Sequence, residues 1–509
     1  MTERVVHKAT LFVYLFINIF RIFVWIVNYS VMKRLAVIIF MIFSFASAEA
    51  KLNLSRLHSD GMVLQQNTEA KIWGTSSPDA QITVVPSWDG KAYKCKADSE
   101  GNWNVHIATP AGSYETYTLT VKGDKETVKV CNILVGEVWM ASGQSNMEMP
   151  MRGFFNCPVE NAADFITAAP ARERIRMITV PIRQSYEPLD DFEGSWQGAD
   201  PNTVPDMSAT AYFFARKLNE VLDVPVGVVA FAYGGARVES WTPKEILETY
   251  PDENLSREAI EAMQHYHRPY LAYNAMFWPV KGYTAKGFIW YQGCSNVGKH
   301  LQFPERMATL INHWRSWWND DKAEMPFYMA EIAPFRYGSN DGVSYASLLR
   351  EAQHEVARTV PNCGIVVTND LVYSYEIDNI HPAMKQPVGE RMAYLALNRD
   401  YGFKRVAYES PRAMKCIAIQ DGSAIGVELS NCWSGLNRVM EIEGLEVAGS
   451  DGIFHPVTAV GFDWENHCMS IRSEEVPAPT QVRYGWGDFN PGNLKNAEGL
   501  PVAPFWVKL

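Results

Sequence analysis

The chain has 509 residues, of which 47% are hydrophobic and 20% are charged, a balance typical of a globular protein with well-filled cores. At this length we expect two or three domains. The formal net charge is −11 and the sequence contains no basic cluster. Nucleic acid is therefore not an expected partner, because binding phosphates requires clustered positive charge.

The N-terminal region contains a segment with the order of features of a secretory signal peptide. A short basic start at Met32–Arg34 is followed by an apolar run over 35–45, and two small-x-small cleavage sites then follow, Ala46-Ser47-Ala48 and Ala48-Glu49-Ala50. This order is typical of export with cleavage after the small residues. We therefore predict a mature protein that is periplasmic or extracellular.

A second apolar stretch, residues 9–31, precedes that segment and is interrupted by Arg21. It is either a membrane anchor or an extension upstream of a true start at Met32. We favour the second interpretation, because a complete signal peptide with its own methionine needs nothing before it. Residues 1–50 are thus interpreted as a targeting segment, and no stable membrane anchor is expected in the mature form.

The eight cysteines are scattered along the chain without a C-x-x-C pair or a Cys/His spacing suited to zinc. We expect no metal and no cofactor. Export would permit disulfides, but the sequence does not indicate which cysteines would pair.

Residues 51–130 form short alternating runs separated by turns. The segments 82–85, 103–107 and 117–121 are rich in β-branched and aromatic residues, and Asp89-Gly90 is one of the turn signals beside them. We predict a small antiparallel domain resembling a β-sandwich over these residues.

From residue 131 to about 400, apolar strand-like runs alternate with helical patterns such as 209–222 and 347–360. This alternation predicts an α/β domain with a mainly parallel sheet covered by helices. After about residue 401 the strand-and-turn pattern returns, so 401–509 is predicted to be a C-terminal β-rich region.

A candidate nucleophile lies at residues 143–147 (Gly-Gln-Ser-Asn-Met), at the end of a strand-like run. Ligands of open parallel sheets bind beyond the carboxyl ends of the strands. Ser145 is therefore well placed to attack a carbonyl group. The motif differs from the G-x-S-x-G elbow, because Met147 replaces the second glycine, and an ordinary polar turn is the competing interpretation.

A second strand-like run ends in residues 292–296 (Gln-Gly-Cys-Ser-Asn). Here Ser295 is a rival nucleophile, and Asn296 has an amide that could donate to an oxyanion. Farther along, Asp378 lies three residues before His381, a spacing at which a carboxylate can orient an imidazole. Either pattern taken alone also fits a simple loop.

Paired glycines at 234 and 235 follow another strand-like run. Glycine allows backbone N–H groups to approach a ligand closely, so this turn is a candidate oxyanion site. A tight turn between a strand and a helix is the equally simple alternative.

Together, these four blocks resemble the SGNH hydrolases, and specifically the branch of sialate O-acetylesterases and related acetylxylan esterases. The resemblance implies an SGNH-type three-layer α/β/α domain over 131–400. It also implies Ser145, Asp378 and His381 as a catalytic triad. The implied oxyanion-hole residues are Ser145, Gly234, Gly235 and Asn296, and the implied substrate-binding residues are Gln144, Gln292 and Arg350.

One position departs from the pattern. Similar proteins usually carry Glu in the block W-Y-Q-G-E-S-N, and here the residue is Cys294. In some acetylxylan esterases that Glu is the triad acid, so the carboxylate role is expected to fall on Asp378 alone.

The resemblance implies deacetylation of O-acetyl sialic acid through an acetyl-enzyme, with an acetylated sugar or glycan as the partner. Two alternatives stay open: an acetylesterase that acts on xylan or another acetylated glycan, and a non-catalytic carbohydrate-binding protein that has kept the fold.

Overall fold

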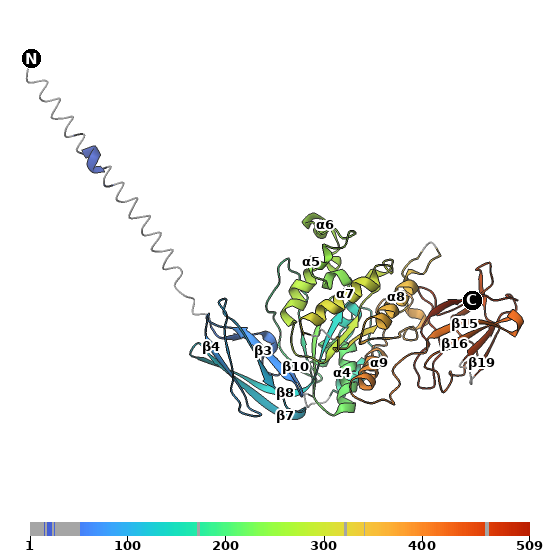
Figure 1. Ribbon diagram of the computed structural model, residues 1–509, viewed down its shortest axis with the longest axis horizontal. Helices are drawn as coiled ribbons and strands as arrows, with labels where there is room; N and C mark the ends of the chain where they lie inside the picture. The colour runs from blue at the N-terminus through green and yellow to red at the C-terminus, as the bar shows by residue number, and fades with distance from the viewer. Residues whose placement is uncertain are drawn as a thin grey trace, which may run out of the picture.

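The computed structural model describes residues 51–169, 174–319, 323–339, 342–463 and 468–509, together with a few positions between 15 and 25. The predicted signal segment at 32–50 lies outside the described residues. In the part of the chain that is described, no helix has the length and apolar character needed to cross a membrane. Figure 1 shows a central α/β body with a β-rich region at each end.

The strands of the N-terminal region pair antiparallel, except for Val63–Gln65, which pairs in parallel with residues 134–136. One sheet has the order β1-β3-β6, and a second joins β5, β4, β7 and the first part of β8. The three predicted strands correspond to β4, β6 and β7. The strands of this region are β1 (Asn53–Leu54), β2 (Val63–Gln65), β3 (Glu69–Thr75), β4 (Gln81–Pro86), β5 (Tyr93–Lys96), β6 (Asn102–Ala108) and β7 (Ser113–Gly123).

Strand β8 (Glu126–Gly143) connects this region to the central sheet. Its first part pairs antiparallel with β7, up to Val135 opposite Ser113. Its last residues pair in parallel with β11 and β12. The boundary predicted between residues 130 and 131 therefore falls inside one continuous strand that contributes to both regions.

The central sheet has the order β10-β9-β11-β8-β12-β13-β14. All neighbours from β9 to β14 pair in parallel, and only the short β10 is antiparallel to β9. Its remaining strands are β9 (Ile175–Thr179), β10 (Gln197–Gly198), β11 (Val226–Ala232), β12 (Gly287–Tyr291), β13 (Phe327–Ala330) and β14 (Cys363–Val366).

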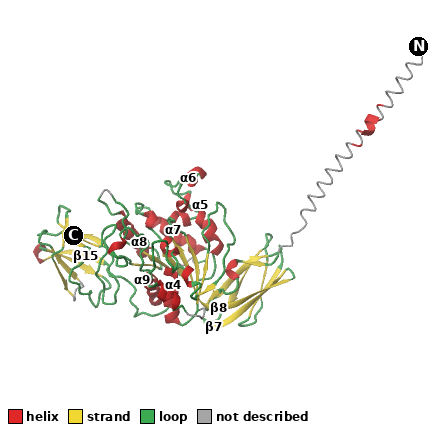
Figure 2. Ribbon diagram, turned by 180° about the vertical axis from the view of Figure 1, so that it is seen from behind, coloured by secondary structure: helices red, strands yellow, loops and turns green. Residues whose placement is uncertain are grey.

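Helices lie on both faces of this sheet (Figure 2). Successive residues of each strand point to opposite faces, so both faces carry side chains that the helices cover. Along β8, Val138 and Met140 belong to the hydrophobic cluster that includes α7 and α8, whereas Trp139 and Ala141 belong to the cluster that includes α4 and α9. The described helices are α2 (Ser145–Glu148), α3 (Ala162–Thr167), α4 (Ala209–Leu222), α5 (Lys244–Leu247), α6 (Arg257–Ala262), α7 (Phe303–Ser316), α8 (Tyr345–Thr359) and α9 (Gln386–Arg399).

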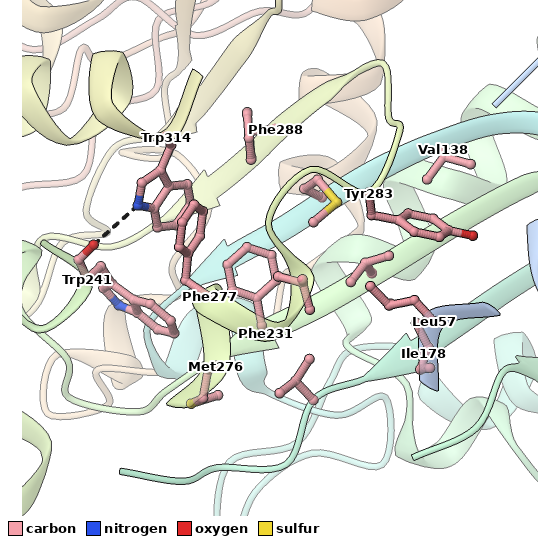
Figure 3. Packing of buried hydrophobic residues seen from close by; sticks show 14 of the residues in the cluster. Leu57, Val138, Ile178, Phe231, Trp241, Met276, Phe277, Tyr283, Phe288 and Trp314 are labelled. Carbon is pink, nitrogen blue, oxygen red and sulfur yellow. Dashed lines mark hydrogen bonds between the residues drawn. The ribbon is translucent and has the colours of Figure 1, made fainter. Parts of the chain in front are cut away.

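Local signals define the ends of these helices. The Ser208 hydroxyl accepts a hydrogen bond from the Ala211 N–H and begins α4, and Asp223 ends it in a left-handed conformation with φ of 50°. Figure 3 shows the aromatic packing on the α7 side, where the Trp314 indole donates to the Trp241 carbonyl at 3.2 Å. This packing fixes α7 against the end of β11.

The C-terminal region consists of two antiparallel sheets, with the orders β15-β16-β20-β19 and β18-β17-β21-β22. Both sheets contribute to one hydrophobic cluster. The strands are β15 (Ala413–Ile419), β16 (Ala424–Leu429), β17 (Leu445–Ala448), β18 (Phe454–Pro456), β19 (Ala459–Asp463), β20 (Cys468–Arg472), β21 (Gln481–Tyr484) and β22 (Phe505–Lys508).

Candidate active site

Ser145 lies at the carboxyl end of β8, in the middle of the parallel sheet. The strand ends at Gly143, whose φ is +140° and where an added Cβ would lie 2.2 Å from the Tyr291 carbonyl oxygen. Only glycine fits such a close approach. Helix α2 begins at Ser145, which remains partly exposed while Gln144 and Asn146 on either side are buried. The sequence thus presents the serine at the sheet edge where ligands of parallel sheets bind.

Gln144 connects the turn that carries Ser145 to the end of β12. Its side-chain oxygen accepts hydrogen bonds from the N–H groups of Gly293 (2.8 Å) and Cys294 (2.9 Å), and only 2% of the residue is exposed. The sequence predicted a substrate-binding role for Gln144. In the structure these contacts hold two strand ends together.

Asn146 brings the loop that carries His381 to the loop that carries Ser145. Its Nδ2 donates to the Ile380 carbonyl oxygen at 3.0 Å, although the two residues are 234 positions apart. The residue after the serine is thus bonded to the residue before the histidine. Among the described hydrogen bonds, none joins His381 directly to Ser145 or to Ser295.

The His381 ring is packed among groups from two loops. Its Nδ1 lies 3.9 Å from the Cys157 sulfur, and the Phe154 ring packs edge-on at 5.2 Å. Burial, and secondarily the charge of Lys385, lowers the pKa of His381 to about 4. The imidazole is therefore neutral at neutral pH, the form that can accept a proton.

Lys385 is itself buried, with 1% exposed, and its ammonium donates to the Pro382 carbonyl. Burial lowers its pKa to about 7, and the carboxylate of Glu376 opposes that shift. Glu376 also accepts hydrogen bonds from the N–H groups of Tyr373 and Ala383, at 2.9 Å each, which orders the loop around the histidine.

Asp378 lies at the surface. Its side chain is 68% exposed, and its Oδ1 lies 3.2 Å from the Arg336 Nε. None of the contacts among the described residues joins Asp378 to His381. The backbone N–H of His381 donates instead to the Oδ1 of Asn379, one of the two residues between them, at 3.0 Å. The structure thus brings the histidine to the serine loop and places the predicted acid in a surface ion pair.

The glycine turn after β11 lies directly against the serine. A Cβ at Gly234 would be 3.4 Å from the Ser145 Cβ, and at Gly235, whose φ is +76°, it would be 2.5 Å from the Tyr266 ring. The Gly234 N–H donates to Glu148 Oε2 at 2.6 Å. The backbone donor predicted for the oxyanion hole is therefore engaged by a carboxylate.

Glu148 is a site residue that the sequence analysis did not identify. It lies three residues after Ser145 on α2, so both side chains share one face of the helix. Burial raises the pKa of Glu148, and the hydrogen bond from Gly234 partly offsets this effect. The i, i+3 spacing was the available signal, but the partner across the turn could not be read from it.

Asn296 and Gln292 belong to a buried polar network. The Asn296 Oδ1 accepts from Gln292 Nε2 (2.7 Å) and from the Val238 N–H (3.1 Å), and its Nδ2 donates to Glu239 Oε2 at 3.1 Å. The two residues are 1% and 0% exposed, respectively. The amide predicted for the oxyanion hole thus donates to Glu239, and a hydrogen bond from Gln292 holds its oxygen.

Arg306 completes this network by donating to Glu239 Oε1 at 2.6 Å. Although burial alone would raise it, the pKa of Glu239 is lowered by Arg237 and Arg306. A charged pair buried in this way needs both partners, because an unpaired buried charge is strongly destabilising.

Arg350, the third predicted substrate-binding residue, is 2% exposed and holds the C-terminal region against α8. It donates to the carbonyl oxygens of Ile332 (3.0 Å), Gly487 (2.9 Å) and Asp488 (3.2 Å). Through these bonds the guanidinium group of Arg350 joins the catalytic region to the C-terminal region, which is a structural role.

Cys294 accepts a hydrogen bond from the Tyr337 hydroxyl at 3.2 Å. Burial raises the pKa of its thiol, so it stays protonated at neutral pH. In the described part of the chain, no group of three His, Cys, Asp or Glu side chains is arranged to hold a metal ion.

Comparison with known proteins places this site within a recognised family. The sequence profile of the carbohydrate esterases described as sialic acid-specific acetylesterases matches residues 135–398, a span that includes Ser145, Gly234, Asn296 and His381. The chain belongs to this family. It is therefore a carboxylic ester hydrolase of the carbohydrate acetylesterase type.

Relatives agree with this assignment. The sialate O-acetylesterase of Mus musculus is 26% identical over 411 residues, which cover 70% of this chain and 74% of that protein. The Homo sapiens enzyme of the same name is 26% identical over 384 residues, covering 70% and 72%. A crystal structure of a carbohydrate acetylesterase from Xanthomonas citri superimposes with a TM-score of 0.79 and 32% identity, over 90% of this chain and 100% of that one.

Proposed function

We propose that the protein is a sialate O-acetylesterase that hydrolyses O-acetyl esters of sialic acid through Ser145, His381 and Asp378. Two kinds of observation support the proposal. The named mammalian relatives are sialate O-acetylesterases, and the proposed residues lie inside the span that the family profile matches. The observation that carries it furthest is the hydrogen bond from Asn146 to Ile380, which brings the serine and histidine loops together.

In the proposed reaction, His381 accepts the proton of the Ser145 hydroxyl as the serine oxygen attacks the acetyl carbonyl. The tetrahedral intermediate collapses when the imidazolium returns the proton to the leaving sugar oxygen. Water then attacks the acetyl-enzyme with the same histidine as base, releasing acetate and regenerating the serine. The lowered pKa of His381 keeps the ring neutral at neutral pH, which is the form that accepts the serine proton.

Asp378 would stabilise the imidazolium that forms during the attack. Its carboxylate pairs with Arg336 and is highly exposed, so it is free to turn without disturbing the core. We infer that Asp378 leaves Arg336 and takes the Nδ1 side of His381 as positive charge develops there, displacing the weak contact with Cys157.

The oxyanion hole would consist of the N–H groups of Ser145, Gly234 and Gly235, with the Asn296 amide as a further donor. Gly234 lies against the Ser145 Cβ, which supports its inclusion. Its N–H becomes available to the substrate only when Glu148 releases it, and Asn296 would have to turn away from Glu239.

We further infer an SGNH-type three-layer α/β/α catalytic domain, supported by the helices on both faces of the sheet. Export is also part of the proposal: cleavage near Ala48 or Ala50 would release a periplasmic or extracellular enzyme. N-terminal sequencing of the secreted protein tests the cleavage position.

An acetylated xylan or another glycan is the second candidate substrate, favoured by the structural similarity to the Xanthomonas citri carbohydrate acetylesterase. Comparing kcat/KM on O-acetyl sialic acid and on acetylated xylan distinguishes the two. Higher kcat/KM on the sialate supports the first proposal, and the reverse favours the glycan. Cleavage of neither these substrates nor a chromogenic acetyl ester would contradict the proposed function.

A further inference from the structure

A cavity of about 280 Å³ lies along the outer edge of β14, away from the serine. In the described sheet β14 is the last strand, separated from β8 by β12 and β13. The cavity is lined by α8, by α9 and by residues 409–412, which lead from the catalytic region into the C-terminal sheets. Four separate parts of the chain therefore meet around it.

The charges around this cavity are mostly positive. Arg358, Arg399 and Arg412 line it, with Glu409 as the carboxylate among the lining residues. The chain as a whole carries a net charge of −11, so the excess of positive side chains around this cavity is the opposite of the charge balance of the whole chain. Arginine clusters in concave sites are suited to oxyanions, which accept several of their N–H donors at once.

Arg358 is paired with Glu351 at 3.0 Å, and the Arg399 Nη1 donates to the Cys363 carbonyl oxygen, whereas the pairing of Arg412 is weaker. Arg412 and Glu409 are 3.6 Å apart at their closest charged atoms, a long separation for an ion pair. The Arg412 Nε is buried without a hydrogen-bond partner. A buried donor left without a partner is uncommon and requires an explanation such as a bound ion or water.

His354 provides a second buried polar atom that has no hydrogen-bond partner. The residue is 5% exposed and lines the cavity. Its Nε2 lies 2.8 Å from Glu331 Oε2, and its Nδ1 is buried without a hydrogen-bond partner. In a neutral ring that donates from Nε2 to Glu331, Nδ1 is an acceptor. The cavity thus combines several cationic donors with one acceptor.

We propose that this cavity binds a small oxyanion that also carries a hydroxyl donor: hydrogen phosphate or a sugar acid. The anionic oxygens accept from Arg399 and Arg412, and the hydroxyl donates to His354 Nδ1. Sulfate at neutral pH carries no proton and cannot satisfy that acceptor. Because the ligand would contact α8, α9 and residues 409–412 together, its binding stabilises the junction between the catalytic and C-terminal regions.

The test is a titration of the full-length mature protein with sodium phosphate, sodium sulfate or sodium glucuronate at constant ionic strength, followed by thermal melting and by calorimetry. Phosphate or glucuronate is expected to raise the melting temperature in a saturable way, and sulfate to have an effect no larger than chloride. The phosphate and glucuronate arms distinguish an inorganic ligand from a sugar acid. Equal effects of phosphate, sulfate and chloride would overturn the proposal.

Matched variants test the assignment of the site. Arg412→Gln is expected to weaken binding by about tenfold or more, because a charge-assisted hydrogen bond is lost. Arg405→Gln is the control, since Arg405 is exposed on the same connection and is not among the lining residues. If Arg412→Gln fails to fold, Arg399→Gln replaces it, because Arg399 is the other proposed donor and is exposed.

Unchanged affinity in the Arg412 or Arg399 variant, or an equal loss in the Arg405 variant, would overturn the assignment. Activity on a chromogenic acetyl ester is measured in parallel and is expected to be unchanged by both Arg412→Gln and Arg405→Gln. The ester readout tests the proposed esterase function separately, so either proposal can fail without the other.

Discussion

Asn146 donates a hydrogen bond of 3.0 Å to the carbonyl oxygen of Ile380, linking the residue after the proposed nucleophile to the residue before the proposed base. Asn146 is 1% exposed, so this bond forms in a water-poor environment. The backbone of Asn146 is held in turn by the Thr210 hydroxyl, which donates to its carbonyl at 3.0 Å. The relative position of the serine and histidine loops therefore depends on one asparagine.

Asn146→Ala is expected to lower kcat/KM on a chromogenic acetyl ester by at least about tenfold, because small misplacements of catalytic groups are costly. Loss of a buried hydrogen bond should also reduce the free energy of unfolding by ~1–3 kcal/mol. Thr210→Val, which releases the backbone of Asn146 but leaves its side chain, should have the smaller effect on activity. Wild-type kinetics in Asn146→Ala would show that the bond is not needed for catalysis.

Glu148→Ala is expected to raise kcat/KM several-fold on a small acetyl ester. The substitution frees the Gly234 N–H for the oxyanion and removes a nearby negative charge. Glu148→Gln is the matched comparison: it removes the charge but retains an acceptor for the N–H, so its gain should be smaller. A loss of more than about tenfold in Glu148→Ala would instead mean that the bond to Gly234 positions the serine turn.

Activity is expected to persist to low pH because His381 must be neutral to act as a base. With a pKa of about 4, kcat/KM should stay level from pH 7 to about pH 5 and fall below about pH 4. Lys385→Met removes a positive charge that lowers the pKa, so the acidic limb should move to higher pH. Initial rates after brief exposure to each pH separate this effect from unfolding. If kcat/KM instead began to fall near pH 6.5, the pKa of His381 would not be lowered by burial of its ring.

The lowered pKa of His381 also predicts how the free energy of unfolding depends on pH. The folded-state pKa of His381 is depressed below its ordinary value of 6.5, so the unfolded chain binds a proton first as the pH falls. The contribution of His381 to the free energy of unfolding is fully present above pH 6.5 and is lost progressively as the pH falls to about 4. Chemical denaturation of wild type and His381→Gln across this range should show a shallower pH dependence in the variant.

Asp378→Asn is expected to lower kcat by about a thousandfold, because the histidine loses the group that stabilises its charged form. Arg336→Gln should leave activity intact or raise it, since it releases Asp378 from its ion pair. Cys294→Ala should retain most activity and show its effect mainly as a lower melting temperature, through loss of the contact with Tyr337. An active Asp378→Asn together with an inactive Cys294→Ala would move the acid role to position 294.

The elements that the sequence predicted well are those with local signals. Alternating apolar residues predicted β4, β6 and β7, and glycines with a strained backbone or a close neighbour marked the ends of β8 and β11. The continuity of β8 was missed because the change of partner, from antiparallel β7 to parallel β11 and β12, leaves no turn in the sequence.

Within the candidate site, the sequence located the segments but not the direction of their side chains. Roles at the site were predicted for Gln292, Asn296 and Arg350, yet each is buried and bonded to other parts of the protein. A motif cannot distinguish a residue that contacts substrate from one that supports it. The contacts of Glu148 with Gly234 and of Cys157 with His381 span 86 and 224 residues, so no local pattern reveals them.

The identity of the nucleophile is tested most directly by covalent labelling. The enzyme is inactivated with a serine-reactive fluorophosphonate, digested, and mapped by mass spectrometry, with His381→Gln as the control for base-dependent reactivity. A single adduct on Ser145, lost in the control, is the predicted result. An adduct on Ser295, or labelling of Ser145 that does not depend on His381, would contradict the proposed catalytic pair.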